Sequence, residues 1–231
     1  MGKQIPAMMG RDTVDEPADV GATDAAWRRW LPLLREAMLT EMGRAPVPSE
    51  SHGEDHIDRV WSRVLALGEE LGADLEVLAA ATFLHDLGRH HVRDEDHGAL
   101  SAELAVPILE RLGFPAEKRA PTLFAIARHD LSFDDVDRTT LESRILFDAD
   151  KLDTFGVVGV TRAIRSWYGR VGIDFILGQL DRRLALLSLP QSRRLAADDY
   201  AFARDFFVRL ADQTGASVAG AYVEDREDRT A

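Results

Sequence analysis

The sequence of 231 residues contains no cysteine. Disulfide bonds, thiol catalysis and cysteine-based zinc sites are therefore excluded. The sequence also lacks any run that approaches the roughly 18 consecutive apolar residues of a transmembrane helix. Its N-terminus lacks the apolar stretch of a signal peptide. We therefore expect a cytoplasmic protein that does not associate with membranes.

Basic residues are scarce relative to acidic ones. Lysine and arginine total 28, aspartate and glutamate total 40, and the net charge is −12. Nucleic-acid polymers and anionic membranes are bound through basic surface, so this charge argues against both as partners. A small anionic substrate remains compatible with it, because a metal ion and a few arginines can balance the charge of such a substrate locally.

Several familiar patterns are also missing. No segment alternates apolar and polar residues in the manner of a strand, and no repeat of fixed period occurs. There is no glycine-rich phosphate loop and no Gly-x-Ser-x-Gly nucleophile motif. Apolar residues make up 45% of the chain, which is enough for a substantial core. We therefore predict an all-α fold: one helical bundle at residues 23–215, a loose N-terminal arm at 1–22 and a flexible C-terminal tail at 216–231.

Apolar residues at helical spacing predict the positions of the helices. We expect a first helix from Asp24, a second that opens at 51–54 and ends before Gly72, and a central buried helix that leads to 85–86. Further helices are expected from Gly98 to near Gly113, from Pro115 or Pro121 to 129, and over 141–150, 155–168, 175–189 and 198–210.

His85 and Asp86 stand side by side at the end of the central apolar helix. A histidine and a carboxylate directed into a core are costly unless something neutralises them, and a divalent metal ion does so. Adjacent helical residues point about 100° apart, so the two can share an ion only near the helix end, which Gly88 marks. The alternative is an inward histidine with an ordinary hydrogen-bond partner.

Four other residues occupy similar positions. His56 lies on the first turn of its helix, where a capping histidine is the alternative, and Asp150 follows Leu146 by one helical turn. His97 and His129 lie on two further helices and could hold a second ion. Asp86 is the natural bridge between two ions, because a carboxylate has two oxygens.

The order of these residues resembles a known signature. His56, then His85-Asp86, then Asp150 looks like the H…HD…D pattern of the HD-domain superfamily of metal-dependent phosphohydrolases. The surrounding segments agree over about residues 50 to 215 and are most similar to small stand-alone bacterial HD hydrolases. These segments are HIDRV at 56–60, AAATFLHDLGR at 79–89 and ILFDADKLDTFGVVG at 145–159.

The resemblance implies a helical bundle of the HD type with a metal site. The implied ligands are His56, His85, Asp86 and Asp150. His97 and His129 resemble the extra pair of binuclear members, although His90 and His91 compete with His97 for its role. One or two divalent ions are implied, with Mn, Fe, Co, Ni, Zn and Mg all open.

The implied activity is hydrolysis of a small phosphate ester, for example a nucleotide, by water activated at the metal. Lys151 and Arg89 are candidates to neutralise charge on the phosphoryl group, although Lys151 could instead pair with Asp148 or Asp153 at the surface. Asp153 or Asp130 is a candidate to orient water or a metal-bound histidine. Further candidates for phosphoryl contacts, each of which could equally form a surface ion pair, are Arg128, Arg162 and Arg165.

Two other functions fit the same residues. The superfamily also contains di-iron oxygenases that cleave C–C or C–P bonds with the same six ligands, and an iron-rich, coloured preparation would favour that chemistry. The second alternative is a binding or regulatory module, which would require a metal whose coordination positions are all filled by protein. A homodimer is left open.

Overall fold

The computed structural model describes residues 26–46, 52–91, 97–130 and 137–216. Within these ranges the secondary structure is helical, and the β-type pairing is limited to an isolated bridge between Tyr168 and Val171. The prediction of an all-α fold is confirmed. The predicted arm at 1–22 and the tail beyond residue 216 lie outside the described residues.

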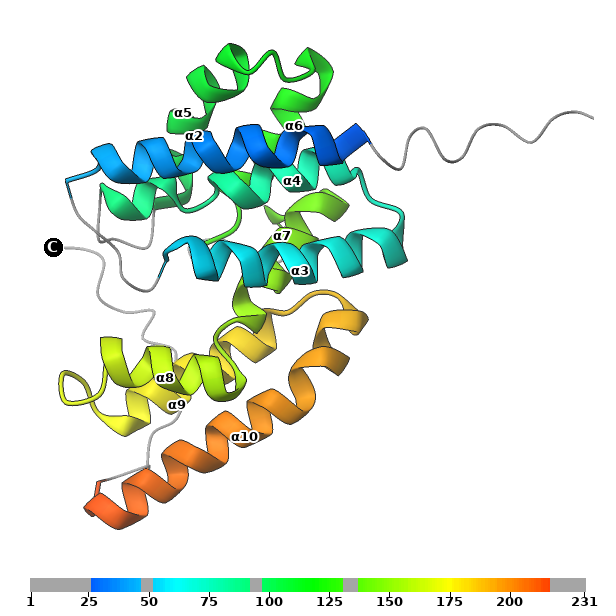
Figure 1. Ribbon diagram of the computed structural model, residues 1–231. Helices are drawn as coiled ribbons and strands as arrows, with labels where there is room; N and C mark the ends of the chain where they lie inside the picture. Colours follow the sequence, from blue (N-terminus) through cyan, green and yellow to red (C-terminus); the bar gives the residue numbers. More distant parts are fainter. Residues whose placement is uncertain (1–25, 47–51, 92–96, 131–136, 217–231) are drawn as a thin grey trace, which may run out of the picture.

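The first group of helices surrounds α4 (Leu75–Leu84), whose residues 77–84 are all buried. A helix that is apolar on every side belongs in the middle of a domain, and α4 contacts α2, α3, α6 and α7 (Figure 1). The members of this group are η1 (Ala26–Arg29), α2 (Trp30–Arg44), α3 (Glu54–Leu71), α4, η2 (Leu87–His90), α5 (His97–Arg111), α6 (Ala116–Ala127) and α7 (Leu141–Leu152).

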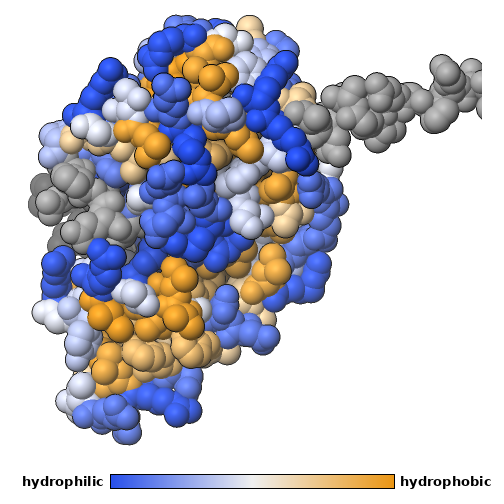
Figure 2. Space-filling view, in the orientation of Figure 1, coloured by the Kyte–Doolittle hydropathy of each residue, from blue (hydrophilic) through white to orange (hydrophobic). Residues whose placement is uncertain are grey.

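The second group comprises α8 (Gly156–Ser166), α9 (Ile173–Leu186) and α10 (Pro190–Thr214), drawn together below the first group in Figure 1. These helices enclose an apolar cluster of their own. Helix α7 joins the two groups, because Leu146 is buried in the first cluster and Leu152 in the second. Helix α8 leaves Val157 and Ile164 exposed, and Figure 2 shows hydrophobic surface over this helix.

Some helix ends follow the predicted signals and others do not; α9, for example, runs over Ile173–Leu186 rather than the predicted 175–189. Helix α3 ends where predicted, at Gly72, whose φ of 69° lies in the left-handed region that suits glycine. Helix α4 ends at Leu84, so that His85 and Asp86 follow the buried helix as predicted. Gly88, however, does not stop α4 but lies within η2, and α10 begins at Pro190 rather than at residue 198.

The reason for glycine at 88 is close packing. A Cβ atom at this position would lie 2.4 Å from the carbonyl oxygen of His97 and 3.0 Å from Oγ of Ser101. The amide of Gly88 also donates to Oγ of Ser101 at 2.9 Å. Gly88 therefore allows η2 to lie directly against the first turn of α5.

None of the described helices is both long and apolar enough to span a lipid bilayer.

Candidate metal centre

Six predicted ligand residues come together from separate parts of the fold. His56 lies on the first turn of α3, His85 and Asp86 follow α4, and His97 begins α5. His129 follows α6, and Asp150 lies in the last turn of α7. All are buried, with exposures of 0% for His56, His85 and His129, 1% for His97, 5% for Asp86 and 8% for Asp150.

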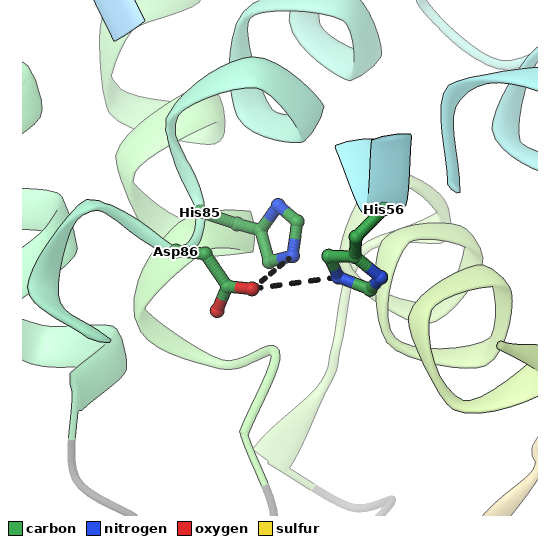
Figure 3. A group of neighbouring side chains, drawn as sticks. All are labelled: His56, His85 and Asp86. Carbon is green, nitrogen blue, oxygen red and sulfur yellow. Dashed lines mark ion pairs between the residues drawn. The ribbon is translucent and has the colours of Figure 1, made fainter. Parts of the chain in front are cut away.

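Asp86 stands between two pairs of histidines. Its Oδ2 lies 3.4 Å from Nε2 of His56 and 3.3 Å from Nε2 of His85, as the dashed lines of Figure 3 mark. Its Oδ1 lies 3.1 Å from Nε2 of His97 and 3.5 Å from Nε2 of His129. Each carboxylate oxygen therefore faces a different pair. The backbone of Asp86, at φ −102° and ψ 9°, occupies the bridge region that many active-site residues adopt.

Hydrogen bonds on the far side of two rings determine which nitrogen faces the centre. Nδ1 of His85 lies 2.7 Å from the carbonyl oxygen of Thr82, and Nδ1 of His129 lies 2.6 Å from that of Ile126. A carbonyl can only accept, so each Nδ1 donates a proton and Nε2 keeps its lone pair. Both Nε2 atoms are therefore in the form that binds a metal ion.

The atoms at the centre are short of partners from the protein. In the part of the chain that the structure describes, Nε2 of His56, Nε2 of His85 and Oδ2 of Asp86 are buried and make no hydrogen bond. Such burial is costly unless a ligand compensates for it. Three overlapping triads have ligand atoms within 4.8 Å of one another: His56–His85–Asp86, His85–His129–Asp150 and Asp86–His97–His129. Imidazole and carboxylate donors in this arrangement fit divalent metal ions.

Three carboxylates surround the imidazole of His56. Burial lowers the pKa of His56, but Asp150, Asp153 and Asp86 outweigh burial and raise that pKa to about 10. For Asp86, burial acts to raise the pKa, but the surrounding histidines hold it well below its usual range. A divalent cation would balance the same excess of carboxylate charge.

Asp153 lies behind His56 and is fully buried. Its Oδ2 accepts from Nδ1 of His56 at 2.8 Å and from Nη1 of Arg162 at 2.6 Å. Its Oδ1 accepts from Nε of Arg59 and from Nη1 of Arg63, both at 2.8 Å. Burial acts to raise the pKa of Asp153, but these donors outweigh it and lower the pKa. The ionised carboxylate is thus placed to fix the ring of His56.

Asp130 contacts the backbone beside a different ligand residue. Its Oδ2 accepts from the backbone N–H of Gly98 at 3.2 Å, at the start of α5 and next to His97. A Cβ atom at Gly98 would lie 2.8 Å from this oxygen, so the glycine makes the contact possible. Neither Asp130 nor Asp153 belongs to the triads within the described residues. Both therefore contact the elements that carry the ligands rather than the centre itself.

Lys151 is buried next to Asp150. Its Nζ lies 2.5 Å from Oδ2 of Asp150, whereas Oδ1 of Asp150 lies 3.4 Å from Nε2 of His56. The alternative prediction for Lys151, an ion pair with Asp148 or Asp153 at the surface, is wrong. Asp148 is occupied by the backbone N–H groups of residues 188 and 189 at the start of α10, and Asp153 by His56 and the arginines.

Arg89 lies on η2, where its backbone N–H donates to the carbonyl of Asp86 at 3.0 Å. Burial lowers the pKa of Lys151, Asp150 opposes this effect, and the charge of Arg89 contributes to the lowering. Arg89 is therefore within electrostatic reach of Lys151.

Of the three histidines predicted for the same ligand role, His97 lies beside Asp86. His97 belongs to a triad with Asp86 and His129, whereas His90 and His91 belong to none of the triads among the described residues. Arg162, one of the further candidates for phosphoryl contacts, instead binds Asp153.

The sequence did not single out His52, Arg59 and Arg63, which contact His56 or its partner Asp153. The signal that could have found them was spacing, because each lies about one helical turn from His56 or from another of the three. His52 precedes the helix, however, and the arginines resembled a solvated helix face.

Comparison with known proteins agrees with this geometry. A family model described as HD domain matches residues 53–154. YpgQ of Bacillus subtilis (strain 168), an uncharacterised protein, is 32% identical over 141 residues, which cover 56% of this chain and 67% of YpgQ. Ribonuclease Y of Cutibacterium acnes is 30% identical over 147 residues, which cover 61% of this chain but 25% of that enzyme.

Solved structures share the fold. A predicted HD superfamily hydrolase from an uncultured Thermotogales bacterium aligns with a TM-score of 0.56 at 26% identity, over 81% of this chain and 92% of that one. YpgQ of Bacillus subtilis in complex with ADP aligns with a TM-score of 0.61 at 23% identity, over 79% of this chain and 97% of that one. The residues of the signature, His56, His85-Asp86 and Asp150, occur in the expected order along the chain and lie together in the structure. The family model matches the segment that contains them, and YpgQ is matched over 67% of its length. The chain therefore belongs to the HD-domain superfamily.

Proposed function

We propose that this protein is a metal-dependent phosphohydrolase that acts on a small phosphate ester, with a nucleotide as the leading substrate class. The observation that carries the proposal is the position of Asp86, each of whose oxygens faces a separate pair of histidines. This arrangement supports two ions bridged by one carboxylate. His56, His85, Asp86 and Asp150 would hold the first ion, and Asp86, His97 and His129 the second. Ions so bound supply Lewis acidity and an activated water for phosphoryl transfer.

The residues around the centre have separate roles in this proposal. Asp153 and the carbonyls of Thr82 and Ile126 keep the histidine rings oriented, so that their Nε2 lone pairs point inward. Lys151 and Arg89 bind the phosphoryl oxygens and stabilise the charge that develops during cleavage. Lys151 acts as a point charge and therefore needs no bidentate geometry.

The preference for a nucleotide has independent support. YpgQ has been crystallised with ADP. The ribonuclease match covers a quarter of that enzyme, and the net charge of −12 disfavours a nucleic-acid polymer. We therefore propose nucleoside mono-, di- and triphosphates as the first substrates to test.

The test begins with elemental analysis of protein purified without added metal. Release of inorganic phosphate is then measured with the metal found, across nucleoside mono-, di- and triphosphates and sugar phosphates. Metal-dependent phosphate release supports the proposal. A coloured, iron-rich preparation that consumes oxygen and releases no phosphate from any ester would instead indicate the oxygenase. A metal ion whose coordination positions are all filled by protein, in a preparation with neither phosphatase nor oxygenase activity, would indicate a binding module.

A further inference from the structure

His52 lies beside the metal centre without belonging to it. The residue precedes α3 and stands one helical turn before His56. The centroids of the two imidazole rings are 5.5 Å apart, and the ring planes are nearly perpendicular at 86°. His52 is only partly buried, unlike the six candidate ligands. His52 therefore combines contact with a ligand ring and partial exposure to solvent.

The ligand geometry separates His52 from the candidate ligands. Among the described residues, the triads whose ligand atoms lie within 4.8 Å of one another involve His56, His85, His97, His129 and the two aspartates. His52 is in none of them. A histidine that touches a ligand ring but stands outside the ligand set occupies a position suited to contact what the metal binds.

The contacts of His56 connect His52 with Lys151. His52 packs against the ring of His56, whose Nε2 lies 3.4 Å from Oδ1 of Asp150. The other oxygen of Asp150, Oδ2, lies 2.5 Å from Nζ of Lys151. A phosphoryl group bound by Lys151 at the metal centre would therefore lie close to His56 and to its neighbour His52.

We propose that His52 is a further catalytic residue, which donates a hydrogen bond to a non-bridging oxygen of the phosphoryl group. The inference rests on the proposed phosphohydrolase function. Neutral and protonated imidazole both carry an N–H group, so the contact requires no change of charge. Glutamine also carries a side-chain N–H donor and can preserve part of the interaction, whereas alanine cannot.

The test compares His52→Ala and His52→Gln with the wild-type full chain, each loaded with Mn²⁺. His91→Ala is the matched control, since it removes a histidine close in sequence to Asp86 but outside the triads. Metal content is measured by elemental analysis, binding of inorganic phosphate by calorimetry, and kcat and KM with ADP. We expect His52→Ala to keep its metal, to bind phosphate about tenfold more weakly and to lose on the order of tenfold in kcat/KM, with partial recovery in His52→Gln and no change in His91→Ala.

The outcomes separate this inference from the proposed function. A wild-type protein that binds phosphate through His52 but hydrolyses no ester would leave the contact standing and overturn the hydrolase. An active wild type whose phosphate affinity and kcat/KM are unchanged in His52→Ala would overturn the role of His52 alone. Loss of metal from His52→Ala would also overturn it, because His52 would then support the metal rather than the substrate.

Discussion

Asp153 is the residue through which the protein holds His56. It is fully buried and accepts from His56 and three arginines. Asp153→Asn keeps the shape but removes the charge, leaving the arginines without their shared anion and His56 without an ionised acceptor. We expect metal affinity to fall by about 10- to 100-fold, the usual effect of losing such a partner. A competition titration against a fluorescent metal chelator measures it.

Asp58→Asn is the control for this variant. Asp58 lies on the same helix as His56 but is exposed and pairs with Arg35. Its loss should leave metal affinity unchanged, because an exposed ion pair contributes little and lies outside the centre. Equal affinities for Asp153→Asn and Asp58→Asn would show that Asp153 does not support the metal.

Lys151 offers a test of phosphoryl stabilisation. Its Nζ contacts the oxygen of Asp150 that lies away from His56. Lys151→Met keeps the length of the side chain and removes the ammonium, so metal content should stay intact. Turnover should fall by a factor on the order of a hundred, the scale of losing one charge-stabilising group. Metal titration and steady-state rates on the same preparation measure both effects.

Lys118→Met is the matched control for Lys151→Met. Lys118 pairs with Asp74 and Glu76 on another part of the fold. Its removal should alter stability but leave kcat unchanged. An unaltered rate for Lys151→Met would assign Lys151 to packing alone.

At the scale of elements, the contact between η2 and α5 brings the two halves of the centre together. Gly88→Ala would place a methyl group against the carbonyl of His97, at 2.4 Å without movement. The start of α5 must then shift, and His97 with it. We expect the protein to retain the ion at His56 and His85 but to bind the second ion more weakly. Metal counted per chain across a titration should fall from two toward one.

Gly43→Ala provides the comparison. Gly43 lies in α2, and a methyl group added there would meet nothing within 4 Å. Alanine in a helix is favoured over glycine by roughly 0.5–1 kcal/mol, so this variant should be slightly more stable and keep its full metal content. If Gly88→Ala also bound two ions with unchanged affinity, the proposed link between Gly88 and His97 would be wrong.

The sequence predicts the elements better than the contacts between them. The apolar spacing places α3, α4 and α7, and the resemblance selects the six residues that converge. Asp153 is among the candidates to orient a metal-bound histidine, but the sequence does not indicate that its partner is His56, 97 residues away. The three arginines that also bind Asp153 look like surface residues along the chain. Such contacts depend on how helices pack, which spacing within one helix does not encode. The role of Gly88 was likewise hidden, because a helix stop and a close approach both favour glycine.

On the scale of the whole molecule, Glu76 connects the start of α4 to its neighbours. It accepts from Nζ of Lys118 at 2.6 Å and from Nε1 of Trp30 at 2.7 Å, and it pairs with the exposed Arg29. Burial acts to raise the pKa of Glu76, but these donors outweigh it and lower the pKa.

A carboxyl group whose pKa is lower in the folded state stabilises the fold above its unfolded pKa of about 4.3. That stability is lost as the pH falls through the lower, folded pKa. Glu76→Gln should therefore reduce stability at neutral pH and flatten the loss of stability in acid. Urea unfolding from pH 7 down to pH 3 measures this dependence, and parallel curves for variant and wild type would contradict it.

The central claim is that Asp86 joins two metal ions in one buried centre, and metal content tests it most directly. Wild type and Asp86→Ala are purified without chelator, loaded with Mn²⁺, desalted and measured by elemental analysis, with circular dichroism to verify that both are folded. We predict two ions per chain in the wild type and none retained in folded Asp86→Ala, because each pair of histidines loses its anionic partner. Full metal content and activity in Asp86→Ala would contradict the account.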